Sequence, residues 1–333
     1  MTAQAVSELL RRATSRERVQ PPDGKSTSSF ERVVIDGDDY FLKRLSYEGD
    51  WIMRVTGDHY HRPYLVWKNG VMDEVPASID HAVVAMEVEG EGDGAELSML
   101  MRDVGAHLVP EGSSVVPASQ HAAFIDHLAE MCARFWGWRD TIGNLTTMEE
   151  RIRFFWTQSV DREMSAEDPP GTIIAAHEGW QVLPDRSSSL ADVAFALHED
   201  PGILSGELAG LPTTFLHGDW KMGNLGSHPD GRTILLDWAY PGSGPACWDL
   251  WWYVCLNRDR LPEPKEDVLE RFRTALERHG VGTSAWFERQ LDLCVIAIMA
   301  CFGWEKALND DAELYWWERR VAEAVRRTGL SLA

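Results

Sequence analysis

The hydrophobic periodicity of the chain changes near residues 101–106, and this change limits the possible folds more than any other feature. Before it, apolar and polar residues alternate as in β-strands. The turn DGDD inside SFERVVIDGDDYFLKRLS (29–46) predicts a hairpin, and 81–90 with 96–105 predict a second strand pair. After it, apolar residues recur at three- and four-residue spacing, which is typical of amphipathic helices. The sequence therefore predicts an α+β protein, in which a small antiparallel sheet lobe (1–103) precedes a mostly helical lobe (104–333).

The individual elements follow from the same spacing. A polar amphipathic helix is predicted for 1–20, although a first strand is also expected before the breaker-rich loop QPPDGKSTSS (20–29). Two short apolar strands are predicted at 213–219 and 233–238, separated by the turn SHPDGR. The segments with helical spacing after residue 106 are 118–138, 147–164, 189–200, 266–280, 285–304 and 311–327.

Charge and cysteine content exclude several classes of protein. The formal net charge of −21 disfavours binding to nucleic acid or to an anionic membrane. The same charge favours a cationic substrate, or it serves solubility alone. No apolar run approaches the roughly 20 residues that span a bilayer, and the first 20 residues lack a signal-peptide core. The five cysteines form no CxxC pair, which predicts free thiols in a reducing cytoplasm rather than a disulfide scaffold or a zinc site.

Polar residues follow the two short predicted strands in the pattern that phosphoryl transfer requires. Such a reaction needs a carboxylate to accept the hydroxyl proton, oxygen ligands for Mg²⁺ and a cation on the nucleotide phosphates. In HGDWKMGN (217–224) Asp219 is the candidate carboxylate. Asn224 and Asp237 are hard oxygen donors that come close together if the two short strands pair with each other. Lys43, at the end of YFLK, is the candidate cation.

These motifs, HGDWKMGN, LLDW (235–238) and the upstream YFLK, resemble those of the aminoglycoside phosphotransferase and choline kinase family, relatives of the protein kinases. The resemblance implies a bilobal protein-kinase-like fold that uses ATP, with GTP possible, and Mg²⁺. It further implies that Asp219 is the catalytic base, that Asn224 and Asp237 bind Mg²⁺, and that Lys43 contacts the nucleotide phosphates. His217 is implied to orient the loop, and Asp249 to support it.

The resemblance assigns fewer definite roles to Lys221, to the segment that follows the last predicted strand of the sheet, and to the carboxylate partner of Lys43. Lys221 stands where this family commonly has His and where protein kinases have Lys, so it either steadies the transferred phosphate or faces solvent. In SMLMRDVG the adenine is expected to hydrogen-bond to the Arg102 carbonyl and the Val104 N–H. The helix carboxylate that pairs with Lys43 in relatives is not evident. The candidates for it are Glu48, Asp58 and Glu74.

The loop DGKSTSS lies where kinases cover the phosphates with a glycine-rich turn, so Ser26, Thr27 and Ser28 are expected to donate hydrogen bonds to them. A Walker A reading of GKST fails, because Val19 stands where the first glycine is required.

The acceptor is the least constrained part of the function. Tryptophans around Asp249 (Trp248, Trp251 and Trp252) either belong to the core or line an acceptor pocket, because indoles stack on sugars and bind cations. Together with the acidic charge, this favours an acceptor with both hydroxyl and amine groups: an aminoglycoside-like antibiotic, an amino sugar or an amino alcohol. A protein kinase is the alternative, although no A-P-E sequence follows Asp237. A non-catalytic nucleotide-binding member of the fold is another. The sequence indicates no oligomeric state.

Overall fold

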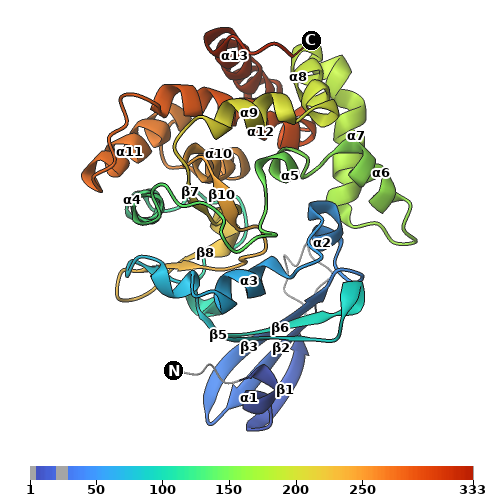
Figure 1. Ribbon diagram of the computed structural model, residues 1–333, viewed down its shortest axis with the longest axis vertical. Helices are drawn as coiled ribbons and strands as arrows, with labels where there is room; N and C mark the ends of the chain where they lie inside the picture. Colours follow the sequence, from blue (N-terminus) through green and yellow to red (C-terminus); the bar gives the residue numbers. More distant parts are fainter. Residues whose placement is uncertain (1–4, 20–28, 333) are drawn as a thin grey trace.

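A five-stranded antiparallel sheet forms the N-terminal part of the protein. In the computed structural model, which describes residues 5–19 and 29–332, its strand order is β1-β2-β3-β6-β5. The sheet lies at one end of the molecule, and most of the helices lie at the other (Figure 1). The elements of this part are α1 (Val6–Leu10), β1 (Ala13–Val19), β2 (Ser29–Ile35), β3 (Asp38–Ser46), α2 (Trp51–Thr56), α3 (Arg62–Lys68), β4 (Ile79–Asp80), β5 (Val83–Glu89) and β6 (Glu96–Arg102).

Both predicted strand pairs are confirmed. β2 pairs with β3, and β5 pairs with β6. The turn between β2 and β3 has positive φ at Asp36 (54°) and Gly37 (94°), the conformation that lets a two-residue turn follow the right-handed twist of a hairpin. The helix predicted for 1–20 is wrong for most of its length. Only Val6–Leu10 is helical, and Ala13–Val19 is an edge strand, because its backbone pairs with β2 while its middle residues remain exposed.

Helices dominate the rest of the chain, as predicted. They are α4 (Ala118–Arg134), α5 (Met148–Ile152), α6 (Thr157–Met164), α7 (Gly171–Arg186), α8 (Ser188–Glu199), α9 (Gly202–Ala209), α10 (Cys247–Leu256), α11 (Lys265–Arg278), α12 (Phe287–Ala307) and α13 (Asp311–Thr328). α12 is buried over nearly its whole length and packs against α7, α8, α10 and α13. The helix predicted at 147–164 is divided into α5 and α6.

Short strands inside the helical part hold the predicted motifs. They are β7 (Thr214–Leu216), β8 (Leu225–Ser227), β9 (Thr233–Leu235) and β10 (Gly242–Gly244). The two strands expected near 213–219 and 233–238 do not pair with each other, because β7 pairs with β10 and β9 pairs with β8 and, in parallel, with β4. The β8–β9 hairpin still brings the two motifs together, since Asn224 precedes β8 and Asp237 follows β9.

The boundary predicted between residues 103 and 104 lies just after β6, and it stays a prediction. All five cysteines are free and buried. Within the described residues, no helix is long and apolar enough to cross a membrane.

Candidate active site

Asp219 is held by three donors at the loop that follows β7. One carboxylate oxygen, Oδ2, accepts hydrogen bonds from Lys221 Nζ at 2.6 Å and from Asn224 Nδ2 at 2.8 Å. The other, Oδ1, accepts the indole N–H of Trp252 at 2.7 Å. The Asp219 side chain is 14% exposed, so it reaches the surface at the edge of a buried network. Donors on both oxygens fix the plane of this carboxylate.

Asn224 and Asp237 are joined through the backbone of the β8–β9 hairpin. The N–H of Leu236 donates to the Asn224 carbonyl at 2.9 Å, which sets Asp237 beside the end of the Asp219 loop. Both side-chain hydrogen bonds of Asn224 use its amide nitrogen, donated to the main-chain carbonyl and the carboxylate of Asp219. This arrangement turns the amide oxygen of Asn224 away from Asp219.

Lys43 connects the sheet to the segment that follows β9. It lies on β3, and its Nζ stands 3.0 Å from Asp237 Oδ1. Burial disfavours the charged form of Lys43, but the carboxylates of Asp237, Asp50 and Asp219 outweigh burial and raise its pKa. Burial likewise acts against the ionised form of Asp237, and the ammonium groups of Lys43 and Lys221 outweigh it and lower the pKa of Asp237.

The loop rests on a buried carboxylate. Asp249, in the first turn of α10, accepts the main-chain N–H groups of His217 and Gly218, both at 3.0 Å. Burial raises the pKa of Asp249 to about 7, and the nearby guanidinium of Arg151 acts in the opposite direction. Arg151 is fully buried, with its guanidinium 4.8 Å from the ring centroid of Tyr240. The charge of Asp249 therefore depends on a buried cation supplied by α5.

His217 and Asn257 complete the support of the loop. His217 is fully buried and its Nδ1 lies 3.3 Å from the N–H of Asp219, while burial lowers the pKa of His217 to about 4. The imidazole is therefore neutral near pH 7 and serves as an acceptor for the loop backbone. Asn257, at the end of α10, accepts the N–H of Met222 at 3.1 Å. α10 thus contacts the loop through Asp249, Trp252 and Asn257.

Sequence reasoning missed four residues of this network, namely Asp50, Arg151, Trp252 and Asn257. Asp50 caps α2 by accepting the N–H groups of Ile52 and Met53, and its charge supports that of Lys43. Trp252 was expected in the core or in an acceptor pocket, not as a donor to Asp219. An Asp directly before a short helix is a signal that could have indicated Asp50. No local pattern indicates Trp252.

None of the three carboxylates suggested as partners of Lys43 pairs with it among the described residues. Glu74 pairs with Arg134, and Asp58 accepts the N–H groups of Tyr60 and Arg62. Glu48 is exposed. The partner that the structure gives to Lys43 is Asp237.

The remaining predicted positions concern the nucleotide. Arg102 ends β6, its N–H donates to the Ala82 carbonyl, and its guanidinium pairs with Asp80. Val104 follows β6 and is buried. The adenine contacts expected of Arg102 and Val104 stay predictions. The predicted phosphate-loop residues Ser26, Thr27 and Ser28 lie outside the described residues.

Two ion pairs join the N-terminal helices to the helical part. Arg54 of α2 bonds Glu163 of α6 through two of its nitrogens, the shorter contact being 2.7 Å, and Glu163 is only 4% exposed. Arg62 of α3 is 2% exposed and bonds Glu150 at 2.8 Å and the Asn144 carbonyl at 3.1 Å. These contacts hold α2 and α3 against the helical part.

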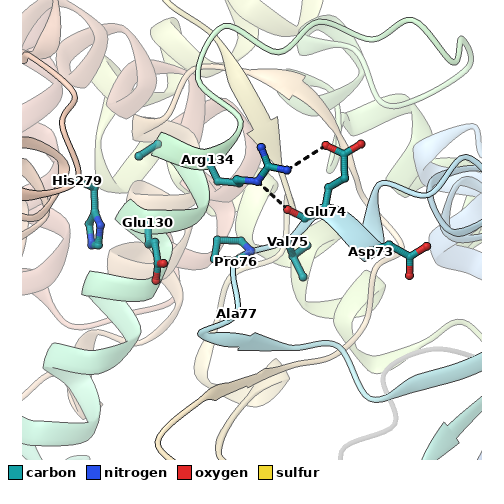
Figure 2. Close-up of a pocket in the computed structure, with 9 residues that line it drawn as sticks. Asp73, Glu74, Val75, Pro76, Ala77, Glu130, Arg134 and His279 are labelled. Carbon is teal, nitrogen blue, oxygen red and sulfur yellow. Dashed lines mark hydrogen bonds and ion pairs between the residues drawn. The ribbon is translucent and has the colours of Figure 1, made fainter.

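A surface cavity of about 520 Å³ lies elsewhere, between the 73–77 segment, α4 and His279 (Figure 2). Arg134 extends across it to the side chain and the carbonyl of Glu74. The cavity is lined by Glu74, one of the suggested partners of Lys43, but by none of the residues predicted as base, metal ligands or nucleotide contacts. The candidate active site is therefore defined by the network around Asp219.

Several solved structures align with this chain over nearly the whole length of both chains, at low sequence identity. A choline kinase from Streptococcus pneumoniae is 13% identical, with 97% of this chain and 96% of that chain covered and a TM-score of 0.47. A microcompartment-associated aminopropanol kinase is 14% identical, with 96% and 95% covered and a TM-score of 0.48. A spectinomycin phosphotransferase in complex with ADP and spectinomycin is 14% identical, with 97% and 95% covered and a TM-score of 0.49.

No curated protein sequence matches the chain. The model of the phosphotransferase enzyme family, in contrast, matches residues 49–281, well over half of the chain and including the whole loop from His217 to Asn224. The chain therefore belongs to the phosphotransferase enzyme family and is a kinase that acts on hydroxyl groups.

Proposed function

We propose that the protein transfers the γ-phosphoryl group of ATP to a hydroxyl of a small molecule that carries amine groups, with Asp219 as the catalytic base. One observation carries this proposal: Asp219, Asn224, Asp237 and Lys43 form a continuous network at the junction of the sheet and the helical part. Phosphoryl transfer depends on placing a base, oxygen ligands and a cation together, and these residues supply all three.

The donor set around Asn224 and Asp237 fits Mg²⁺. The amide oxygen of Asn224 is turned away from Asp219, and the carboxylate of Asp237 is ionised and 31% exposed. Both are hard oxygen donors of the kind that Mg²⁺ prefers. When bound, Mg²⁺ would neutralise charge on the phosphates. Lys43, already paired with Asp237, would hold the phosphates on the side of the sheet.

Lys221 contributes a second positive charge beside the base. It is 30% exposed and pairs with Asp219 at 2.6 Å, so it is neither buried in the core nor directed freely into solvent. In this proposal its ammonium steadies the transferred phosphate, while Asn224 and Trp252 keep the base in place.

The nucleotide base is proposed to bind at the end of β6, with hydrogen bonds to the Arg102 carbonyl and the Val104 N–H. Ser26 and Thr27 are proposed to contact the phosphates. We place the protein in the cytoplasm, because its five free, buried cysteines suit a reducing compartment.

A cationic acceptor is supported by charge rather than by tryptophan stacking. The net charge of −21 attracts amines and repels nucleic acid and anionic membranes. Trp248 and Trp251 are fully buried, so they belong to the core and cannot stack on an acceptor. A protein substrate is less well supported, because the chain passes from Asp237 through β10 directly into α10 and leaves no room for an activation segment.

The test is an ADP-release screen with Mg-ATP and Mg-GTP against aminoglycosides, other antibiotics, amino sugars and amino alcohols, with neutral sugars as the matched control class. We expect ADP release above the rate in water for at least one amine-bearing acceptor, and a phosphomonoester in the product. Preference for neutral acceptors would overturn the proposed acceptor class. Phosphate incorporation into protein alone would overturn the small-molecule assignment.

A further inference from the structure

Three tryptophans on α10 have similar burial but different partners for their indole N–H groups. Trp251 donates to the carbonyl of Leu291 at 2.9 Å, a contact between α10 and α12. Trp248 Nε1 has no hydrogen-bond partner among the described residues. Trp252 alone of the three donates to a predicted catalytic group, Asp219 Oδ1, at 2.7 Å. The three side chains are between 0 and 2% exposed, so burial alone does not distinguish them.

The Trp252 ring is fixed by aromatic neighbours from three different segments. Its centroid lies 4.8 Å from that of Phe302 on α12, 5.6 Å from that of Phe154 between α5 and α6, and 6.0 Å from that of Tyr240. A ring packed on these sides has no alternative rotamer available without displacing its neighbours. The N–H therefore points at Asp219 because of the packing of the helical part, not because of a flexible contact.

The two oxygens of Asp219 are unequally occupied. Among residues 5–19 and 29–332, which the structure describes, Oδ2 accepts from both Lys221 and Asn224, whereas Oδ1 accepts from Trp252 only. Each carboxylate oxygen has two lone pairs, so Oδ1 keeps one for a further hydrogen bond. A carboxylate held on one oxygen alone can still turn about its Cβ–Cγ bond, since that torsion is broad. Holding the second oxygen stops this rotation.

We propose that Trp252 is a positioning residue for phosphoryl transfer: its indole N–H fixes Asp219 so that the vacant lone pair of Oδ1 faces the acceptor hydroxyl. This inference rests on the proposed function. The acceptor hydroxyl gives its proton to Asp219 Oδ1 while its oxygen forms a bond to the γ-phosphorus. The bond between the γ-phosphorus and the β–γ bridging oxygen breaks, and ADP leaves with that electron pair. An uncharged indole performs this positioning without adding a cation that would compete for the carboxylate.

The test compares Trp252→Phe with Trp251→Phe, measured as ADP release from Mg-ATP with water as the acceptor. Both variants lose an indole and one hydrogen bond of similar length, but only the first loses contact with Asp219. We expect kcat to fall roughly 10- to 100-fold in Trp252→Phe, with the KM for ATP changed less than about threefold, because misplacing a reacting group by about 1 Å costs up to 100-fold in rate. Trp251→Phe should lower thermal stability while keeping kcat within about twofold.

A second measurement needs no turnover and keeps Trp252 in place. In the indole region of a ¹⁵N-correlated spectrum of the whole chain, Asp219→Asn should move the Trp252 Nε1–H resonance, assigned by its loss in Trp252→Phe. The same substitution should leave the Trp251 resonance unchanged. An unmoved Trp252 resonance would show that the contact is absent and would overturn the inference.

The kinetic outcomes separate the inference from the proposed function. If the wild-type chain turns over and Trp252→Phe matches Trp251→Phe in kcat, the positioning role is overturned and the proposed function survives. If the wild-type chain neither binds Mg-ATP nor releases ADP with any acceptor, the proposed function falls and the inference falls with it.

Discussion

Replacing Gly218 with alanine tests the geometry on which the site depends. Gly218 has a φ of +87°, which L-residues with side chains rarely adopt. A Cβ at this position would overlap the carbonyl oxygen of Tyr240 and the guanidinium of Arg151, and would lie 3.0 Å from the Tyr240 carbonyl carbon. Neither neighbour has room to move, because both are buried. Backbone strain and overpacking therefore act together at one residue.

The size of the effect follows from these two contributions. Left-handed strain costs about 1–2 kcal/mol, and overpacking a buried position costs about 1–3 kcal/mol, so the free energy of unfolding should fall by roughly 2–5 kcal/mol. For a chain of 333 residues, an unfolding entropy of about 2.1 cal/mol/K per residue converts this loss to a decrease in Tm of about 3–7 °C.

Gly231→Ala is the matched control. Gly231 has a φ of +95° in the turn between β8 and β9, and no atom of the residues that the structure describes lies within 4 Å of where its Cβ would stand. The Gly231→Ala variant should therefore lose only the contribution from backbone strain, which corresponds to a Tm decrease of about 2 °C by the same conversion. Differential scanning calorimetry of both variants gives the comparison. Equal Tm decreases would refute the close approach of Tyr240 and Arg151 to Gly218.

Three further perturbations test other parts of the account. Lys43→Met should lower kcat/KM for ATP by about 100-fold, a loss of about 2.7 kcal/mol, because it removes the cation paired with Asp237; a loss below threefold in coupled-assay kinetics would contradict this role. Glu163→Gln should lower the free energy of unfolding by about 1–3 kcal/mol in urea titrations, because it weakens a buried partner of Arg54; an unchanged midpoint would count against the link between the two parts. Burial lowers the pKa of His198 to about 4, below its unfolded value of 6.5. Between these two pH values the unfolded state binds more protons than the folded state, so the free energy of unfolding decreases as the pH falls from about 6.5 towards 4. His198→Gln should therefore lose about 2–3 kcal/mol less stability than the wild type between pH 7 and pH 4.5, and parallel stability curves would contradict this.

Features encoded by neighbouring residues could be predicted from the sequence. The β2–β3 hairpin follows from DGDD, because Asp36 and Gly37 tolerate positive φ. The change from strands to helices follows from periodicity alone. The residues proposed as base, metal ligands and phosphate cation were found because their residue types and spacing match a known chemistry.

Features that depend on distant contacts could not be predicted. Apolar residues continue through 147–164, yet the helix breaks between α5 and α6. Main-chain carbonyls near the break accept hydrogen bonds from distant side chains: Trp180 donates to the Phe155 carbonyl at 2.8 Å, and Cys301 donates to the Arg151 carbonyl at 3.0 Å. The pairing of β7 with β10 is another such contact. The bond from Trp252 to Asp219 joins residues 33 positions apart, and no pattern within α10 distinguishes Trp252 from its neighbours.

The most direct test of the central claim is a paired measurement on Asp219→Asn: calorimetric titration with Mg-ATP, and ADP release in the presence of the best acceptor found in the screen. Asparagine keeps the size of the side chain and one acceptor oxygen but cannot take up a proton from the hydroxyl. We expect the Kd for Mg-ATP to stay within about threefold of the wild-type value while kcat falls at least 100-fold. Retention of wild-type turnover in Asp219→Asn would show that Asp219 is not the catalytic base.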